Sequence, residues 1–432
     1  MKRAIVVGTG AGGATAARAL AGHMDVTVLE AGAEFRRFQG GLDFIERLRA
    51  SRLMVDPRMI RLLFPAMRVD MVSDGMALVR GIATGGTTTL ATANALRCDE
   101  ELLRRGIDLT AEFRSLEEEL PISTAHQRRW QPVTRQLFAT CEQLGLQPAL
   151  TPKLADYSRC GRCGRCVLGC PSGAKWDSRR FLDQAVERGA GLLTGAKVER
   201  VVVRDKGPGR ATGVVVRSGG RRRFMEADLV VLAAGGLGTG AILARSGIET
   251  QDHLFVDPVL CVAARVERTY ADEEVPMPFY VEGDGYMISP YFDYLSFFFN
   301  RAWRTSRHDV VSLMIKLADS EQGSVGERRV KKSLSARDRD RLAEAKAKCV
   351  DMLTGFGVDR GDIFLGSLNA GHPGGTLPLT GVERSSLHAD HLPENLYVAD
   401  ASLLPTALGR PPILTIMALA QRIGTICAER FS

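Results

Sequence analysis

The feature that most restricts the fold lies at the N-terminus, where an apolar strand, a glycine-rich turn and an alanine-rich helix follow one another. Residues 4–7, which follow Arg3, are apolar. Gly8, Gly10 and Gly13 then form the pattern GxGxxG, and residues 14–20 are rich in alanine. In such a unit the first glycine permits a tight turn, the second admits a pyrophosphate and the third lets the helix pack on the strand. The sequence therefore predicts a doubly wound α/β domain that binds a dinucleotide.

A carboxylate follows the second predicted strand. Residues 26–29 are apolar or β-branched and end in Glu30. A carboxylate there would accept hydrogen bonds from the adenosine ribose hydroxyls and repel a 2′-phosphate. The motif does not by itself distinguish FAD from NAD. A later loop at 80–88, rich in glycine and threonine, is suited to contact a phosphate or a flavin edge.

Four cysteines lie within eleven residues, at Cys160, Cys163, Cys166 and Cys170, and Pro171 follows the last. This spacing is typical of the ferredoxin pattern for a [4Fe–4S] cluster, and soft thiolates select iron–sulfur or zinc. Zinc and a disulfide loop remain alternatives. In two-cluster ferredoxins the last cysteine of such a run serves the other cluster, so a remote thiol is an alternative fourth ligand. The remote thiols are Cys98, Cys141, Cys261, Cys349 and Cys427.

Length and composition place the chain among ordinary globular proteins. Its 432 residues exceed one core and suggest two or three domains, and it is 45% hydrophobic and 25% charged. No apolar stretch reaches membrane-spanning length. A strand begins almost at the first residue, which leaves no room for a signal peptide, and nine cysteines indicate a reducing compartment. We expect a cytoplasmic protein, with peripheral contact to a membrane as an alternative, and no nucleic-acid partner.

The net charge of +7 has two interpretations. Short Arg-rich runs such as 221–223 indicate a solvated basic face. The alternative is a docking site for an acidic redox partner or an anionic lipid.

Five segments in this order resemble the GMC (glucose–methanol–choline) family of FAD-dependent oxidoreductases, and the resemblance spans nearly the whole chain. They are GTGAGG with LEAG, the RG…GGTT loop, LAAGGLGTGAILARSGI, GHPGGT, and NLYVADASLLPT with PPILTIMALAQRI. A subset of that family carries a cysteine-rich segment similar to CGRCGRCVLGCPSGAKW. The resemblance implies FAD rather than NAD, and a helix near the C-terminus whose positive end faces the flavin N1–C2=O edge.

The resemblance also implies which residues hold FAD. They are Gly8, Gly10, Ala11, Gly12, Gly13, Glu30, Arg80, Gly85, Gly86, Thr87, Thr88, Asn94, Val198, Ala234, Gly235, Asp400, Pro412, Ile413 and Leu414.

His372 occupies the place of the family's general base near flavin N5. An imidazole that titrates near neutrality can take an alcohol proton as hydride leaves. The second family position departs from the pattern, because Pro411 stands where most members have Asn or His. Proline neither titrates nor donates a hydrogen bond, so His372 acts alone or the substrate differs from the usual alcohols.

The predicted architecture is a doubly wound FAD-binding domain with a second, antiparallel-sheet substrate domain. The FAD-binding domain is expected to comprise residues 1–100, 190–255 and 380–432, the cysteine-rich segment 101–189 and the substrate domain 256–379. Aromatic residues are concentrated between Phe279 and Trp303. They could form a sheet core, the wall of an apolar substrate pocket or a membrane-docking patch.

A flavin takes two electrons as hydride, whereas an iron–sulfur cluster passes them singly. The predicted function is an FAD-dependent dehydrogenase that oxidises an apolar alcohol and relays electrons through the cluster to a ferredoxin-like protein, a quinone or a dye. Three alternatives remain: a related flavoprotein that reduces or forms C=C bonds, a zinc-stapled oxidase without the relay, and a non-catalytic flavin-binding electron carrier.

Overall fold

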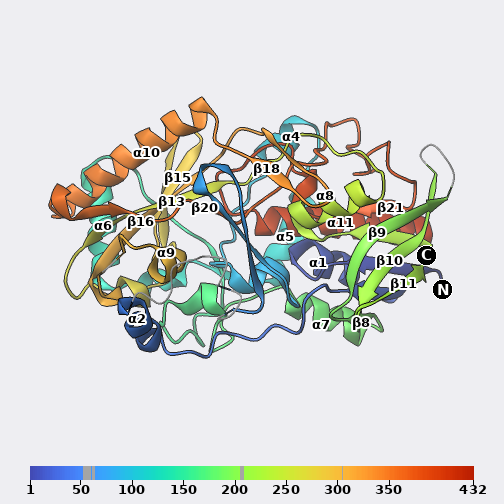
Figure 1. The fold of residues 1–432 in the computed structure, drawn as a ribbon, viewed down its shortest axis with the longest axis horizontal. Helices are drawn as coiled ribbons and strands as arrows, with labels where there is room; N and C mark the ends of the chain where they lie inside the picture. Colours follow the sequence, from blue (N-terminus) through green and yellow to red (C-terminus); the bar gives the residue numbers. More distant parts are fainter. Residues whose placement is uncertain (52–59, 61–63, 205–208, 304) are drawn as a thin grey trace.

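The computed structural model describes residues 1–51, 60, 64–204, 209–303 and 305–432. Its two principal sheets lie at opposite ends of an elongated molecule (Figure 1). The first is a parallel sheet in the order β21-β12-β1-β2-β8. Its strands are β1 (Arg3–Val7), β2 (Asp25–Leu29), β8 (Gly191–Leu193), β12 (Leu229–Leu232) and β21 (Leu396–Val398). This sheet confirms the predicted doubly wound α/β fold class.

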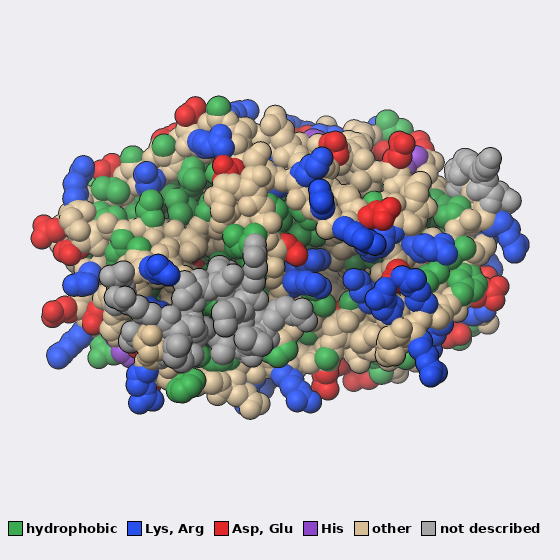
Figure 2. Space-filling view, in the orientation of Figure 1, with side chains coloured by type: hydrophobic (Ala, Val, Ile, Leu, Met, Phe, Trp, Pro, Cys, Tyr) green, Lys and Arg blue, Asp and Glu red, His purple; other side chains and the backbone are tan. Residues whose placement is uncertain are grey.

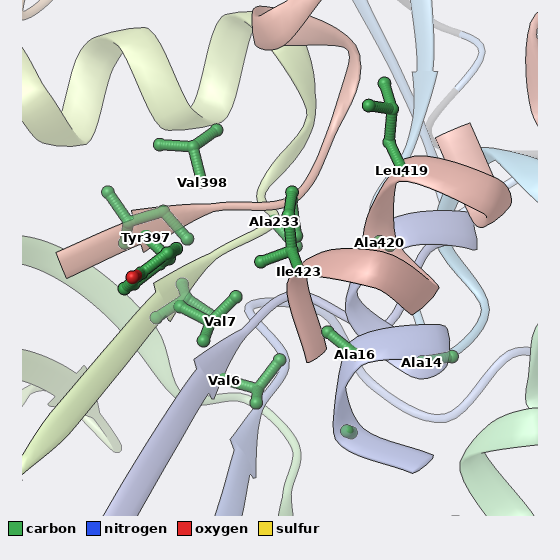
Figure 3. Close-up of a cluster of buried hydrophobic side chains, with 14 of the residues drawn as sticks. Val6, Val7, Ala14, Ala16, Ala233, Tyr397, Val398, Leu419, Ala420 and Ile423 are labelled. Carbon is green, nitrogen blue, oxygen red and sulfur yellow. The ribbon is translucent and has the colours of Figure 1, made fainter. Parts of the chain in front are cut away.

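Two helices rich in small residues pack together on the parallel sheet. They are α1 (Ala11–Leu20) and α11 (Ile413–Phe431). Figure 3 shows Ala16 of α1 beneath Ala420 and Ile423 of α11. The helices approach closely, because a Cβ at Gly424 would lie 2.6 Å from the Cβ of Ala19. This contact fixes the N-terminus of α11 beside the glycine turn that precedes α1.

The second large sheet has nine strands in the order β3-β4-β20-β13-β16-β15-β14-β6, with β19 paired to β13. The strands are β3 (Met67–Met71), β4 (Ala77–Gly81), β6 (Ala149–Leu150), β13 (Pro258–Arg265), β14 (Phe279–Gly283), β15 (Tyr286–Pro290), β16 (Val310–Leu317), β19 (Ile363–Leu365) and β20 (Asn369–Ala370). Apart from the parallel pair β4–β20, its pairings are antiparallel.

Helices cover both faces of this sheet. α6 (Pro132–Gln143) and α10 (Ala336–Gly355) share a buried apolar cluster with one face, and α2 (Leu42–Ala50) and α9 (Tyr294–Phe299) share another with the opposite face. Cys349 is fully buried in α10.

The remaining strands and helices are smaller elements. They are the sheet β9 (Lys197–Arg204), β10 (Arg210–Ser218) and β11 (Arg221–Glu226), the pairs β5 (Ile122–Ser123) with β7 (Lys153–Leu154) and β17 (Gly323–Val325) with β18 (Val330–Lys332), and the helices α4 (Glu100–Arg104), α5 (Thr110–Glu119), α7 (Arg179–Glu187) and α8 (Gly235–Arg245). Within the described residues no helix is both long and apolar enough to cross a membrane.

Strands of the parallel sheet all come from the segments predicted to form the FAD-binding domain. The hairpin of β3 and β4 also comes from the first of these segments, yet it joins the antiparallel sheet. The domain limits given above stay a prediction.

The aromatic-rich segment is helical where strand alternation could have been expected. Phe297, Phe298 and Phe299 lie in α9 and are buried. Asp293 caps this helix by accepting hydrogen bonds from the backbone N–H groups of Leu295 and Ser296. The aromatic rings pack on one another, so they form core rather than an exposed patch.

We predict that Gly424→Leu destabilises the protein by about 1–3 kcal/mol, because the added side chain would force α1 and α11 apart. The neighbouring substitution Thr425→Leu, on the exposed side of α11, is the matched control. Urea unfolding measures both. Equal midpoints for the two variants would contradict the close packing of these helices.

Candidate functional site

A cavity of about 1130 Å³ lies where the carboxyl ends of the parallel strands meet the antiparallel sheet. Its lining combines the glycine turn before α1, the start of α8, the start of α11 and the β3–β4 hairpin. Carboxyl ends of parallel strands are the usual ligand-binding edge of a doubly wound sheet. The cavity therefore lies where the sequence predicted a dinucleotide.

Each glycine of the GxGxxG turn has a distinct environment. Gly8 has φ +104°, and a Cβ there would lie 2.3 Å from the carbonyl oxygen of Ala233. A Cβ at Gly13 would lie 2.0 Å from the carbonyl oxygen of Gly8. At Gly10 a Cβ would meet no atom within 4 Å. Gly8 and Gly13 thus permit packing, whereas Gly10 leaves room for a ligand to approach the backbone.

Glu30 is held by two hydrogen bonds at the cavity wall. The Thr9 hydroxyl donates to Glu30 Oε2 at 2.5 Å, and the backbone N–H of Gly32 donates to Oε1 at 2.8 Å. Burial raises the pKa of this carboxyl, and the hydrogen bond from Thr9 opposes that rise. Thr9 also accepts from the backbone N–H of Gly85, which joins the first glycine turn to the second loop.

Most of the residues predicted to hold FAD line this one cavity. They are Gly8, Gly10, Ala11, Gly12, Glu30, Arg80, Gly86, Thr87, Thr88, Val198, Ala234, Gly235, Asp400, Pro412 and Ile413. Asp400 itself accepts from the backbone N–H of Gly235 at 2.8 Å and from the Thr239 hydroxyl at 2.5 Å. The start of α11 lies at the cavity, which directs the helix's partial positive charge toward it.

Four of the predicted residues do not line the cavity. Gly13 packs on Gly8, and Gly85 supplies a left-handed turn with φ +89°. Asn94 is fully buried and bonded to the Lys153 ammonium, and Leu414 belongs to the apolar core.

Positive side chains at the cavity were not singled out from the sequence. They are Arg68, Lys197, Arg245, Arg328, Arg329 and Lys331. Figure 2 shows Lys and Arg gathered over the part of the surface where β9, β10 and β11 lie. A cationic cavity favours a ligand that carries a pyrophosphate. The run 327–332 was a visible signal, but only the fold places its hairpin beside residues 196–198.

His372 lies at the same cavity, and its side chain is 24% exposed. Its Nδ1 atom is buried, has no hydrogen-bond partner among the described residues, and lies 3.8 Å from Asp257 Oδ2. Burial, with the nearby charge of Lys316, holds the pKa of His372 well below its usual value. The imidazole is therefore neutral near pH 7 and free to accept a proton.

A buried ion pair lies behind His372. Lys316 Nζ is 2.7 Å from Asp257 Oδ2, and both side chains are 1% exposed. Asp257 Oδ1 also accepts from the backbone N–H groups of Leu408 and Gly409, at 3.1 Å each. Burial raises the pKa of Asp257 and lowers that of Lys316, and their mutual attraction opposes both shifts. This pair ties His372 to the loop that leads to Pro411.

The four cysteines of the run lie in one loop beside η5, a 3-10 helix at Arg165–Leu168. All nine cysteines of the chain are free thiols, so the disulfide alternative is not realised. The loop rests on its neighbour at Gly164, where a Cβ would lie 1.8 Å from the carbonyl oxygen of Asp272. The charges of Cys163 and Cys170 each raise the pKa of Cys166, which indicates their proximity.

The spacing of these sulfur atoms differs from that of a zinc site. Among the described residues, no three potential ligand atoms that include a cysteine sulfur lie within 4.8 Å of one another. Tetrahedral zinc with Zn–S bonds of about 2.3 Å would bring its sulfur atoms to within about 3.8 Å of one another. Zinc and an iron–sulfur cluster therefore both stay predictions for this loop.

Two buried lysines lie between the cysteine loop and the cavity. Lys175 donates through Nζ to the carbonyl oxygens of Thr88 and Thr89, at 2.9 and 2.7 Å, and its backbone N–H lies 3.5 Å from Cys170 Sγ. Lys153 is 1% exposed, and burial lowers its pKa to about 7. Neither ammonium pairs with a carboxylate of the described chain, so an anionic group at the thiols would compensate both charges.

Asp272, Glu273 and His308 form another set of potential ligands, with atoms within 4.8 Å of one another. Arg307 Nη1 lies 2.5 Å from Asp272 Oδ2, and His308 Nδ1 lies 3.0 Å from Oδ1. Both oxygens of the central carboxylate already have partners, so this set is a structural ion-pair group.

Comparison with known proteins decides the family. The family model described as "GMC oxidoreductase" matches residues 3–262. The chain belongs to the GMC oxidoreductase family. Membership implies FAD, and the glycine cradle, Glu30 and the cationic cavity fit that cofactor.

Several relatives are similar over part or all of this GMC chain. An uncharacterized protein of Methanocaldococcus jannaschii is 28% identical over 62% of this chain and 68% of its own length. An uncharacterized GMC-type oxidoreductase of Mycobacterium tuberculosis is 33% identical over 57% of this chain, and a long-chain-alcohol oxidase of Arabidopsis thaliana is 30% identical over 60%. The matched regions cover only 39% and 36% of these last two proteins.

The crystal structure of pyridoxine 4-oxidase from "Mesorbium loti" has the same fold. It superimposes with a TM-score of 0.73 over 100% of this chain and 99% of that one, at 17% sequence identity.

We predict that Gly10→Val leaves the fold intact but lowers the retention of FAD at least about tenfold, a change of about 1.4 kcal/mol. The side chain would enter the space where the cofactor approaches the backbone. Gly361→Val, at a position that also meets no atom but lies away from the cavity, is the control. Flavin absorbance per chain after gel filtration measures the difference. Equal flavin content would contradict the role assigned to Gly10.

Proposed function

We propose that this GMC oxidoreductase is a dehydrogenase that oxidises the CH–OH group of an apolar alcohol and relays the electrons through a [4Fe–4S] cluster. The oxidation of an alcohol is supported by a neutral, partly exposed His372 on the wall of the cavity that fits FAD. The relay is supported by the four-cysteine loop and by the two buried lysines beside it, neither of which forms an ion pair with a carboxylate of the described chain.

FAD, when bound, accepts the hydride from the alcohol carbon. His372 takes the hydroxyl proton at the ring nitrogen away from Asp257, since its Nδ1 is buried. As the imidazole becomes positive, the carboxylate of Asp257 stabilises it at 3.8 Å. Residues of the cavity wall such as Met67, Val69 and Ile82 offer an apolar surface for the rest of the substrate.

An apolar alcohol fits this wall better than a sugar, because these three apolar side chains line the same cavity as His372. Two proteins similar to this chain are named as oxidases of hydroxylated molecules, a long-chain alcohol in one case and pyridoxine in the other. We therefore place an apolar primary alcohol first among the candidate substrates.

Residues that would hold the cluster are Cys160, Cys163, Cys166 and Cys170. We assign Cys170 as the fourth ligand because burial disfavours its thiolate, yet hydrogen bonds from the backbone of Lys175 and Ser172 prevail and lower its pKa. The remote cysteines are all buried in the protein interior, and burial raises the pKa of each thiol. A ferredoxin-like protein, a quinone or a dye would then take electrons one at a time.

C=C reduction or desaturation is the second candidate, and the absence of a titratable side chain at Pro411 favours it. Turnover with a panel of alcohols and a dye acceptor separates the two. Reduction of the bound flavin by a primary alcohol supports dehydrogenation, and no reduction by any alcohol in the panel supports the second candidate.

We predict that His372→Ala lowers kcat/KM for the alcohol by about 10²–10⁴-fold, because the proton acceptor is removed, while FAD stays bound. His23→Ala, an exposed position, is the matched control. Dye-coupled turnover and flavin absorbance are measured on the same samples. Turnover at the control's level in the His372 variant would exclude this residue as the base.

We predict that the acid limb of the pH profile of kcat/KM lies below about pH 6.5, the ordinary histidine value, because the pKa of His372 is lowered. Protonation would abolish the base only below that lowered pKa. Lys316→Met removes a positive charge that lowers the pKa of His372, so the acid limb should move to higher pH. Lys332→Met, which breaks the buried pair with Asp319, controls for lost stability. An unmoved limb in the Lys316 variant would disprove the assignment.

We predict about four iron atoms and four acid-labile sulfides per chain after purification without oxygen. Cys163→Ser should lower the iron content at least twofold by removing a ligand, whereas Cys349→Ser, in the core between α10 and the sheet, should not. Metal analysis that found zinc and no iron would refute the relay.

A further inference from the structure

Six arginine side chains surround the cysteine loop, here residues 159–175. They form what we call the arginine collar: Arg37, Arg129, Arg159, Arg162, Arg165 and Arg180. None of them forms an ion pair with a described residue, although many other arginines do, among them Arg179, Arg307 and Arg410. The formal charge of the whole chain is +7, so a basic surface is in keeping with its composition.

Members of the collar are held in place by the loop itself. Arg37 donates to the carbonyl oxygen of Pro171 at 2.6 Å, and Arg129 donates to that of Cys160 at 2.8 Å. Arg180 and Arg159 donate to the carbonyl oxygens of Gly173 and Ser172, at 3.0 and 3.4 Å. These bonds hold four of the six guanidinium groups against the loop, and none of the four lies in an ion pair with a described carboxylate.

The collar is accessible to solvent. Arg159, Arg162 and Arg180 are exposed, and Cys160 and Cys163 are partly exposed. A second cavity, of about 590 Å³, opens beside Cys170 and is lined by Arg159 and Arg180. The carboxylates of Asp177, Asp183 and Glu34 line it too, but Asp177 is paired with Arg179. Asp156, the nearby carboxylate that acts on Arg159 and Arg180, is bonded to Ser158.

We propose that the arginine collar is the docking surface for a small acidic protein that carries single electrons. This inference rests on the proposed function, since it needs the cluster at the four cysteines. An acidic protein would find fixed cations on the side of the loop where the thiols approach the surface. Complementary charge steers such encounters and suppresses wrong partners.

Charge and polarity favour a protein over the other acceptors. A neutral quinone carries no charge that the six arginines could attract. Peripheral membrane binding relies on buried apolar area in addition to charge, and the exposed large apolar side chains among the described residues include none from residues 155–180. Residues 155–180 themselves therefore offer charge without a large exposed apolar side chain, and the exposed aromatic Tyr270 lies two residues from Asp272, which the loop contacts at Gly164.

The exchange balances in electrons. Oxidation of one CH–OH group to a carbonyl releases two electrons and two protons. Two oxidised carriers arrive in turn, each gains one electron, and the two protons pass to solvent. The oxidant is the acidic one-electron carrier protein.

The test compares two double variants with the same change of charge. Arg159→Glu with Arg162→Glu reverses two exposed members of the collar. Arg221→Glu with Arg223→Glu reverses two exposed arginines on β11, which also lack ion pairs with described residues. The probe is a reduced acidic [2Fe–2S] ferredoxin, mixed rapidly with oxidised holoenzyme, and the readout is the second-order rate constant of its reoxidation. This reaction requires no substrate.

We expect the collar variant to react about tenfold more slowly than wild type at about 0.1 M salt, and equally fast at about 1 M salt, where the Debye length falls from about 10 to 3 Å. The β11 variant should match wild type throughout. Equal slowing of both variants, or no slowing, would overturn the proposal. So would collar-dependent binding to anionic phosphatidylglycerol vesicles with an unchanged ferredoxin rate.

Two controls separate this proposal from the proposed function. Iron and sulfide content, and oxidation of the dithionite-reduced protein by uncharged 1,4-benzoquinone, should be equal in all three proteins. If all three proteins contain iron and the collar variant reacts with ferredoxin as fast as wild type, the docking proposal is wrong and the relay is unaffected. If the wild-type protein contains no iron, both the proposed electron relay and the docking proposal are wrong.

Discussion

The close approach of backbones around the glycine turn is the constraint on which the rest of the structure depends. A Cβ at Gly8 would meet the carbonyl oxygen of Ala233, and one at Gly12 would lie 1.7 Å from that of Ala399. The turn is therefore packed against the ends of β12 and β21. The same contacts set α1 against α11 and leave Gly10 facing open space. Cofactor cavity, helix dipole and Asp400 all take their positions from this one turn.

Charge is arranged around the cavity in three layers. Lys and Arg side chains line the cavity in which a pyrophosphate would lie, and the Asp257–Lys316 pair is buried behind His372. Lys153 and Lys175 separate the cavity from the cysteine loop. Lys175 contacts both sides, because its ammonium binds the loop at 88–89 and its backbone lies near Cys170. Lys175 therefore contacts both the loop of the FAD cavity and the loop proposed to hold the cluster.

The sequence predicted what local patterns encode. The GxGxxG turn, Glu30 and the parallel sheet follow from spacing and apolar runs, and the family model confirms the resemblance. Contacts between distant residues were not predictable. Asp257, Lys316 and His372 meet only because β13 and β16 pair, in a register that sets Val259 opposite Lys316. The helix α9 was also missed, because a run of Phe and Tyr suits a buried strand as well as a buried helix until Asp293 caps it.

A reductive titration with dithionite in the absence of oxygen, followed by optical absorbance and EPR, tests the central claim that flavin and cluster share this chain. The account predicts uptake of about three electrons per chain, two by the flavin and one by the cluster, and an EPR signal of a reduced [4Fe–4S] centre. Uptake of about two electrons with flavin bleaching alone would contradict it.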